Sequence, residues 1–319
     1  MAKVVFINGG GPKVQQIFEQ LAVKGLAAQC LDQSASNEEK KAALAGAEYL
    51  VLHPAQLDDA LLAAAPKLKL IQLLTAGYDK MNLGLCRKRQ IAVATNGGAN
   101  AASVAEHSVA LLLAIYRRLK DGDAAVRAGA WRKPIQEFTT FEIAGKTVGV
   151  LGAGNIGRRA AQLYKAFGAD ILYYDRQASD FMEQELGAKK AGLEEIVRRA
   201  EVLSVHLPLF AETRNLLGTK EFARMKPELV LINTSRAEVI EEKALLAALR
   251  EKRLRAAGLD VFYEEPVGPD NPFLGLENVL LSPHVAGHSA EGWERRCALA
   301  WENIKRVEQG QLPKALVRS

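Results

Sequence analysis

Residues 146–175 read KTVGVLGAGNIGRRAAQLYKAFGADILYYD, and this stretch decides the fold. The apolar run at 148–151 predicts a buried strand, and the apolar spacing over 155–167 predicts an amphipathic helix. Glycines fill the turn between them, and a second apolar run at 171–174 follows the helix. The stretch therefore predicts a strand–helix–strand unit, which is the building block of a parallel, doubly wound α/β sheet.

The glycines of this turn follow the spacing G-x-G-x-x-G. Gly152 permits a tight turn, Gly154 lets the backbone approach a pyrophosphate, and Gly157 lets helix and strand pack closely. The first N–H groups and the positive dipole end of the helix also favour phosphate. Asp175 follows Gly157 by 18 residues, where a carboxylate accepts hydrogen bonds from the ribose hydroxyls of a dinucleotide. The pattern predicts that NAD binds here.

The glycine spacing alone is a weak signal, because glycines are common in turns. The flanking strands, the helix and the acidic strand end make it specific. Arg176 lies beside Asp175, and an arginine at this position would offset the repulsion of a 2′-phosphate and tolerate NADP. NAD remains the predicted cofactor, with NADP as the alternative.

Length and composition are those of a globular protein with two domains. The chain has 319 residues, 49% of them hydrophobic and 25% charged, and its net charge of +5 is scattered along the sequence. This mild basic excess suits small anionic ligands and predicts no nucleic-acid partner. No apolar run is long enough to span a membrane, and the start of the sequence lacks a signal-peptide core. The cysteines, Cys30, Cys86 and Cys297, lack paired spacing, so we expect no disulfides, no metal site and a cytoplasmic location.

The first hundred residues alternate between predicted strands and helices. Short β runs lie at 4–7, 49–52, 68–73 and 91–94, and helical patterns lie at 14–23, 38–45 and 57–64. This alternation predicts a second parallel sheet, of flavodoxin-like type, without a glycine fingerprint of its own. We expect it to form a substrate-binding domain from residues 1–102 together with 288–319.

The dinucleotide-binding domain is expected to span residues 103–287. Ser103-Val104-Ala105-Glu106 matches a capping box, which predicts that one long helix starts there and ends in the basic residues before Gly122. The predicted strands of this domain are 148–151, 171–174, 202–207, 229–233, 256–261 and 279–281. Six parallel strands complete a Rossmann domain.

Candidate catalytic residues follow the last three of these strands. Arg236 could bind a carboxylate with two hydrogen bonds, and His284 could exchange a proton near neutral pH. Glu265 could accept the second imidazole N–H and orient the ring. These residue types suit hydride transfer between a nicotinamide and C2 of a 2-oxo or 2-hydroxy acid. The sequence indicates no acidic partner for His53, His107 and His206, and we expect His288 to be a neighbour of the acid rather than the acid itself.

The loop Thr75-Ala76-Gly77 follows a predicted strand of the first domain. Ligands of open α/β sheets bind at such strand ends, and exposed N–H groups on a glycine turn can hold a carboxylate. The loop is therefore a candidate for substrate binding, although a glycine that only turns the chain would explain it equally well.

The chain resembles the D-isomer-specific 2-hydroxyacid dehydrogenases, which include D-3-phosphoglycerate dehydrogenase and hydroxypyruvate reductase. The resemblance covers essentially the whole chain and rests on six segments in order: TAGYD, SVAEH, VGVLGAGNIG, NTSRAEVI, AGLDVFYEEP and SPHVAG. It implies an NAD-dependent oxidoreductase whose catalytic residues are Arg236, Glu265 and His284. It also implies that Ala76 and Gly77 donate N–H groups to the substrate carboxylate.

The resemblance adds further residues to the predicted cofactor site. They are Asn155, Ile156, Arg176, His206, Pro208, Thr213, Thr234, Ser235, Asp260 and Gly287. Two departures stand out: Ala237 follows Arg236 where the family has glycine, and Glu241 replaces an aspartate. Glu265 argues against formate as substrate, because related formate dehydrogenases carry glutamine there.

Partners and substrates leave several hypotheses open. The leading one is a homodimeric reductase of a small 2-oxo acid, paired through the helix that starts at Ser103 and the segment around Trp131. An NAD(H)-sensing scaffold of the corepressor type is an alternative, since the resembling family contains such proteins. A third hypothesis keeps the enzyme but makes an inorganic acid such as phosphite the substrate. The sequence leaves open which acid is used and which direction the reaction runs.

Overall fold

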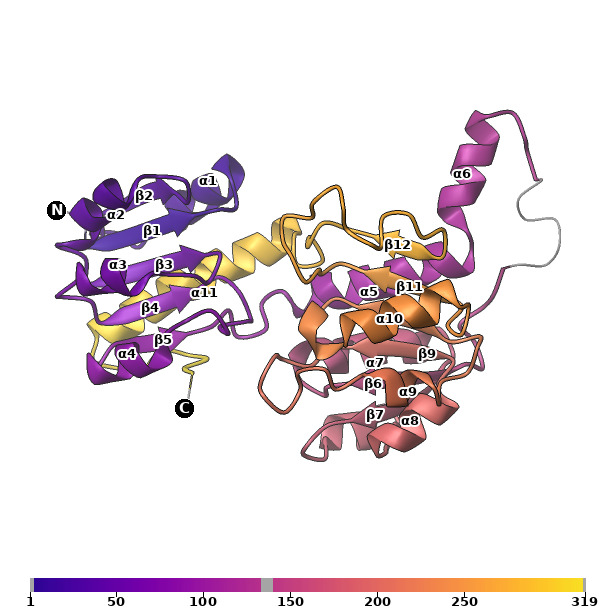
Figure 1. Ribbon diagram of the computed structural model, residues 1–319. Helices are drawn as coiled ribbons and strands as arrows, with labels where there is room; N and C mark the ends of the chain where they lie inside the picture. Colours follow the sequence, from indigo (N-terminus) through magenta and orange to yellow (C-terminus); the bar gives the residue numbers. More distant parts are fainter. Residues whose placement is uncertain (1–2, 133–139, 318–319) are drawn as a thin grey trace. The chain divides into compact units, whose positions relative to one another are not determined.

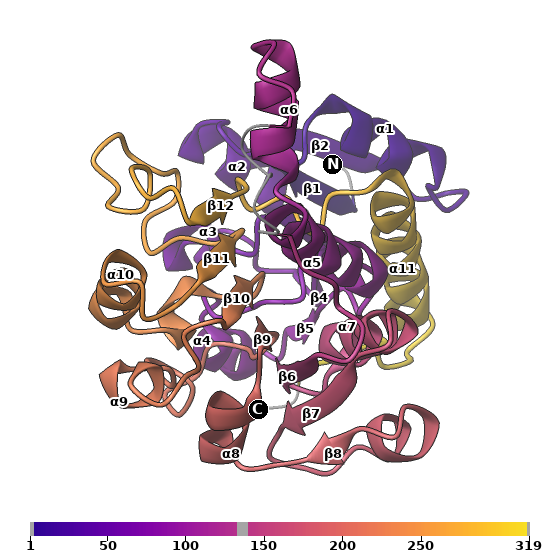
Figure 2. The same ribbon diagram turned by 90° about the vertical axis from the view of Figure 1, so that its right-hand side faces the viewer.

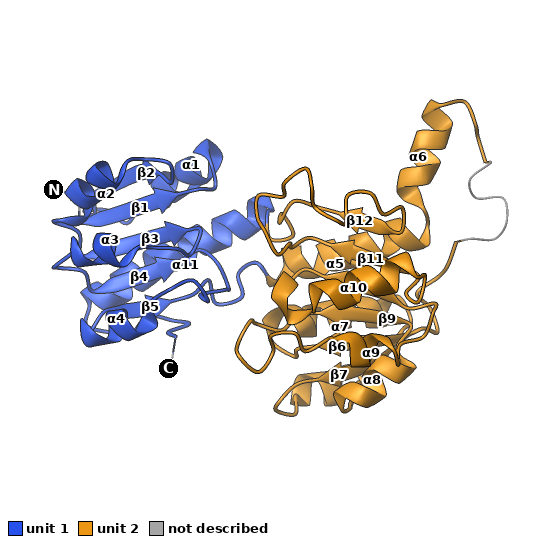
Figure 3. Ribbon diagram, viewed as in Figure 1, with its two compact units in different colours: residues 1–100, 288–319 blue, residues 101–287 orange. Residues whose placement is uncertain are grey.

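A computed structural model describes residues 3–132 and 140–317. The chain forms two compact units, one made of Met1–Asn100 with His288–Ser319 and the other of Ala101–Gly287 (Figure 3). These boundaries lie next to the division expected from the sequence. The assignment of substrate binding to the first unit stays a prediction.

The first unit contains a parallel sheet of five strands in the order β2-β1-β3-β4-β5, which is the flavodoxin-like order (Figure 1). Its strands are β1 (Val4–Asn8), β2 (Ala28–Asp32), β3 (Tyr49–His53), β4 (Leu70–Leu73) and β5 (Ala92–Ala94). Strand β2 was not predicted. This edge strand reads AQCLD and is only partly buried, so its sequence carries no apolar run.

Both faces of this sheet are covered by helices. Val4 and Phe6 of β1 face one core, and Val5 and Ile7 face the other, because side chains alternate along a strand. The first core is closed by α1 (Pro12–Gln20) and α11 (Ala290–Glu308). The second core is closed by α2 (Asn37–Leu44), α3 (Asp59–Ala63) and α4 (Leu83–Lys88).

The second unit contains a parallel sheet of seven strands in the order β12-β11-β10-β9-β6-β7-β8 (Figure 2). Its strands are β6 (Thr147–Leu151), β7 (Asp170–Tyr174), β8 (Lys189–Lys190), β9 (Val202–Val205), β10 (Val230–Asn233), β11 (Ala256–Leu259) and β12 (Val279–Leu281). Six strands were predicted, and β8 is the additional one. It consists of two exposed lysines at the sheet edge, so no hydrophobic pattern in the sequence predicts it.

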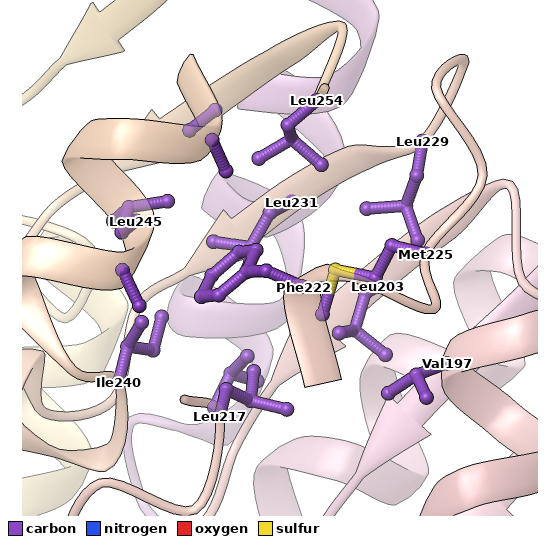
Figure 4. Packing of buried hydrophobic residues seen from close by; sticks show 14 of the residues in the cluster. Val197, Leu203, Leu217, Phe222, Met225, Leu229, Leu231, Ile240, Leu245 and Leu254 are labelled. Atoms are coloured by element: carbon purple, nitrogen blue, oxygen red, sulfur yellow. The ribbon is translucent and has the colours of Figure 1, made fainter. Parts of the chain in front are cut away.

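Helices cover both faces of this sheet as well. On one side lie α5 (Ala101–Tyr116) and α7 (Asn155–Ala166), and on the other lie α8 (Leu193–Arg199), α9 (Thr219–Phe222) and α10 (Glu242–Arg250). In the core between the sheet and α8, α9 and α10, Phe222 lies among Leu217, Leu231 and Leu245 (Figure 4). Two short elements, η2 (Phe181–Glu185) and η3 (Ala237–Val239), complete the unit. From β6 the chain continues to β7 and β8 on one side and then to β9–β12 on the other, so the strand order reverses at β6. Ligands of such sheets bind at the carboxyl ends of the strands at this point.

The prediction of one long helix capped by Ser103 is wrong. Helix α5 begins at Ala101, so Ser103 is a buried residue of its first turn. The alanines before Ser103 have the highest helix propensity and extend the helix beyond the capping pattern. The helix ends at Tyr116, and Arg118, in the left-handed region with φ of 49°, precedes a separate helix α6 (Leu119–Arg127).

Trp131, beyond α6, is 67% exposed. Part of the segment predicted to surround it, residues 133–139, lies outside the described residues. Among the helices that the structure describes, none combines the length and apolar character needed to cross a bilayer.

Candidate active site

The glycine turn between β6 and α7 has the shape that a dinucleotide requires. Gly152 has a φ of 99°, and a Cβ on it would lie 2.7 Å from the His206 carbonyl oxygen. A Cβ on Gly157 would lie 1.8 Å from the Gly152 carbonyl oxygen, so only glycine permits this packing. A Cβ on Gly154, by contrast, would meet no atom within 4 Å. The protein leaves space beside Gly154, at the start of α7, and a pyrophosphate fits that space.

The acidic residue expected at the ribose lies at the end of β7. The Ala153 N–H donates to Asp175 Oδ2 at 2.7 Å, which ties the carboxylate to the glycine turn. Arg176, the next residue, is exposed, and its carbonyl accepts a bond from Lys190 Nζ at 3.3 Å. The carboxylate is thus fixed beside the space at Gly154, as a ribose contact requires.

The end of β9 carries a buried polar chain that the sequence did not predict. His206 Nε2 lies 2.8 Å from Ser204 Oγ, which lies 3.2 Å from the Tyr164 hydroxyl of α7. Burial lowers the pKa of His206 from 6.5 to about 4. The imidazole is therefore neutral at physiological pH. In the loop that follows, Thr213 Oγ1 donates to the Pro208 carbonyl at 2.6 Å.

The segment after β10 is held by its own polar groups. Asn233 Oδ1 accepts from both the N–H and the hydroxyl of Ser235, and Asn233 Nδ2 donates to the Arg236 carbonyl at 3.0 Å. Thr234 Oγ1 lies 2.9 Å from Ser108 Oγ of α5, in a buried position. Because the Thr234 side chain points into the core, we expect any cofactor contact there to come from its backbone. These bonds fix where Arg236 leaves the sheet.

The three predicted catalytic residues follow β10, β11 and β12, and two of them, Glu265 and His284, are in contact. His284 Nδ1 lies 2.7 Å from Glu265 Oε2, and the Phe262 N–H donates to Glu265 Oε1 at 2.9 Å. Burial raises the pKa of Glu265, but the bonds from His284 and Phe262 and the charge of Arg236 outweigh burial and leave the pKa below its ordinary value. The carboxylate is therefore ionised at neutral pH and accepts the His284 Nδ1–H.

This contact selects one tautomer of His284. With Nδ1–H donated to the carboxylate, Nε2 is the ring nitrogen that can exchange a proton with a substrate. His284 has a φ of 53°, and 48% of its side chain is exposed. The arrangement offers an accessible proton donor, an orienting carboxylate and a guanidinium, and these are the groups that reduction of a 2-oxo acid needs.

Asp260, predicted as a cofactor contact, is fully buried. Its carboxylate accepts bonds from Ser282 Oγ at 2.6 Å and from the N–H groups of Val285 and Ala286. His107 Nε2 lies 2.9 Å from Ser282 Oγ and 3.6 Å from Asp260 Oδ1. The sequence did not predict Asp260 as the acidic partner of His107, because the two residues lie far apart along the chain.

The predicted substrate loop belongs to the first unit. It follows β4, and Thr75 Oγ1 donates to the Gly77 carbonyl at 2.8 Å, so the turn is closed by its own side chain. His53 and His288 also lie in this unit, each packed against Trp293 with ring centroids 4.8 and 5.3 Å away. His288 therefore belongs to the first unit, and the Glu265–His284 pair belongs to the second, so the expectation that His288 neighbours the acid stays a prediction.

Comparison with known proteins agrees with this geometry. The sequence profile of the D-isomer specific 2-hydroxyacid dehydrogenase NAD binding domain matches residues 109–286, more than half of the chain. The chain belongs to this family. It is accordingly an NAD(P)-dependent oxidoreductase that acts on 2-hydroxy and 2-oxo acids, with the two-sheet α/β fold of the family.

Individual members of the 2-hydroxyacid dehydrogenase family match most of the chain. The glyoxylate reductase of Korarchaeum cryptofilum is 38% identical over 263 residues, which cover 82% of this chain and 79% of that protein. The D-3-phosphoglycerate dehydrogenase of Mycobacterium leprae is 36% identical over 271 residues, 85% of this chain and 51% of that protein. An acyclic imino acid reductase, solved in complex with NADPH and D-Arg, has a TM-score of 0.86 at 26% identity and covers 99% of both chains.

Proposed function

We propose that this dehydrogenase reduces small 2-oxo acids of the size of glyoxylate, with NADH as the preferred reductant. The observation that carries the proposal is the Glu265–His284 pair, 2.7 Å apart, beside the positive charge of Arg236. The match to glyoxylate reductases supports the size of the substrate. Glyoxylate has a carboxylate that Arg236 can bind and an adjacent carbonyl that His284 can protonate.

Each of the three side chains has a distinct role in the proposed reaction. The Arg236 guanidinium binds the substrate carboxylate and holds the carbonyl carbon in place. His284 donates a proton from Nε2 to the carbonyl oxygen, and Glu265 stabilises the imidazolium before that step. The nicotinamide, when bound, supplies the hydride. In the reverse direction, His284 removes the proton from the hydroxyl group.

The NADH preference rests on Asp175. Its carboxylate is tied to the Ala153 N–H at the glycine turn, so it cannot easily swing away from an incoming 2′-phosphate. Arg176 is exposed beside it and could pair with that phosphate, which keeps NADPH as the second candidate. The relative solved with NADPH belongs to the same fold.

We also propose that the enzyme is a cytoplasmic homodimer. Leu119, Val126 and Trp131, in and just after α6, are large apolar side chains that are more than half exposed. Exposed apolar groups of this size are typical of surfaces that a partner covers. The three cysteines are all free, as expected in a reducing compartment.

The test is NADH and NADPH consumption by the purified protein with 2-oxo acids of graded size, from glyoxylate through pyruvate and hydroxypyruvate to phenylpyruvate. We expect turnover with the smallest acids, a preference for NADH, and a loss of roughly 10²-fold or more in kcat for Glu265→Gln. An Arg236→Ala variant that turns over every accepted acid at the full rate would refute the assigned roles.

Two other outcomes would point to the alternatives. Tight NADH binding with no turnover of any oxo acid, together with NADH-dependent capture of a protein partner, would favour a corepressor-type scaffold. NAD reduction by phosphite but not by hydroxy acids would favour the inorganic substrate.

A further inference from the structure

The loop that carries His284 is anchored on both sides by one buried carboxylate. Asp260 Oδ1 accepts from the Ser282 hydroxyl, two residues before His284, and from the Val285 N–H at 3.0 Å. Asp260 Oδ2 accepts from the Ala286 N–H at 2.8 Å. His284 itself adopts a left-handed φ of 53°, which a non-glycine residue holds only when its surroundings fix it. The anchoring bonds from Asp260 supply that constraint.

Hydrogen counting determines the direction of the next contact. A serine hydroxyl has a single hydrogen, and Ser282 donates it to Asp260 Oδ1 at 2.6 Å. His107 Nε2, 2.9 Å from the same hydroxyl oxygen, must therefore be the donor in that pair. The result is one directed chain of donors, from His107 through Ser282 to Asp260. It links helix α5 to the loop of His284.

We propose that His107 is a positioning residue for catalysis. Its Nε2–H holds the Ser282 hydroxyl turned toward Asp260, and Asp260 in turn fixes the backbone on which His284 faces Glu265. Without that donor, the Ser282 hydroxyl can rotate, and the anchor on the amino-terminal side of His284 loosens. The inference rests on the proposed role of His284 as the proton donor.

The geometry separates this role from that of an ordinary core residue. The His107 side chain is about one quarter exposed, and its Nε2 lies 3.6 Å from the fully buried Asp260 Oδ1, beyond direct hydrogen-bond distance. Three of the roughly four acceptor positions of the Asp260 carboxylate are taken by Ser282, Val285 and Ala286 within the described chain. The proposed effect of His107 on Asp260 therefore passes through the hydrogen bond to Ser282.

The experiment compares His107→Leu, which removes the donor, with His107→Gln, whose side-chain amide can donate from a similar position. Glu106→Gln, an exposed neighbour on α5, is the matched control. We expect His107→Leu to lower kcat by about tenfold, the equivalent of one hydrogen bond, with KM for NADH and the thermal midpoint nearly unchanged. His107→Gln should recover most of kcat, and Glu106→Gln should match the wild type.

Each other result has a definite meaning. If wild-type protein turns over 2-oxo acids and His107→Leu does so at the same rate, the positioning role is refuted while the proposed function stands. If kcat falls equally in the leucine and glutamine variants, the effect comes from shape, and the inference is also refuted. If wild-type protein turns over no 2-oxo acid, the proposed function itself fails. Should His107→Leu not fold, Ser282→Ala removes the same link and must show the same loss of kcat.

Discussion

Lowering the pH should destabilise the second unit through His206. The native imidazole has a pKa of about 4, against 6.5 for the unfolded side chain. Between these values the unfolded chain binds a proton that the native chain does not, so stability falls as the pH falls. Nδ1 has no hydrogen-bond partner among the described residues, and charging the ring would bury an unpaired N–H group.

The size of the effect follows from the two pKa values. Between about pH 7.5 and about pH 5, linkage gives a loss of about 2 kcal/mol from this one group. This is an upper value, because the residue keeps some contact with solvent. The loss is a large fraction of the free energy of unfolding of a typical domain.

The assay is urea unfolding followed by far-ultraviolet circular dichroism at both pH values, for wild type and for His206→Gln. Glutamine cannot titrate, but its amide can still bond to Ser204. We expect wild type to lose about 2 kcal/mol more than the variant on acidification. Equal losses, or a His206 ring that titrates near 6.5 by NMR in the folded protein, would refute the reasoning.

Other substitutions test the cofactor site and the core. Gly154→Ala should leave the thermal midpoint unchanged but weaken NADH binding, measured by fluorescence titration, by about tenfold or more, because its methyl group enters the space left for pyrophosphate. Gly157→Ala should instead lower the thermal midpoint, since its Cβ meets the Gly152 carbonyl. Asp175→Ser should raise the NADPH to NADH ratio of kcat/KM about tenfold; an unchanged ratio would contradict the ribose assignment. Phe222→Ala should lower the free energy of unfolding by about 3–5 kcal/mol in urea titrations.

Sequence patterns predicted the two α/β sheets, because buried parallel strands such as β6 (TVGVL) and β9 (VLSV) are predominantly apolar runs. They failed at β2 and β8, which lie at sheet edges and bury too little to need such runs. They also placed the start of α5 incorrectly, because local capping chemistry was outweighed by the propensity of the preceding residues.

The candidate site was predictable as far as it consists of strand ends. Arg236, Glu265 and His284 each follow a recognisable strand, and parallel strands bring their carboxyl ends to one edge. The chain from His107 to Asp260 could not be predicted, because it depends on how helix α5 packs against that edge. The turning of Thr234 toward Ser108 is hidden for the same reason.

The first unit is built from two segments that lie far apart in the sequence, because α11 packs in one core with β1 and α1. Trp301 Nε1 donates to the Phe18 carbonyl at 2.7 Å and the two rings stack, although 283 residues separate them. Asn303 Nδ2 likewise bonds to Gln72 Oε1 at 2.7 Å in the core. During synthesis, the strands β1–β5 emerge long before this helix, and until it follows only α1 is available to cover that face of their sheet. The second unit is one continuous stretch and can fold in the interval, so a segment translated after the second unit completes the domain that the strands before it began.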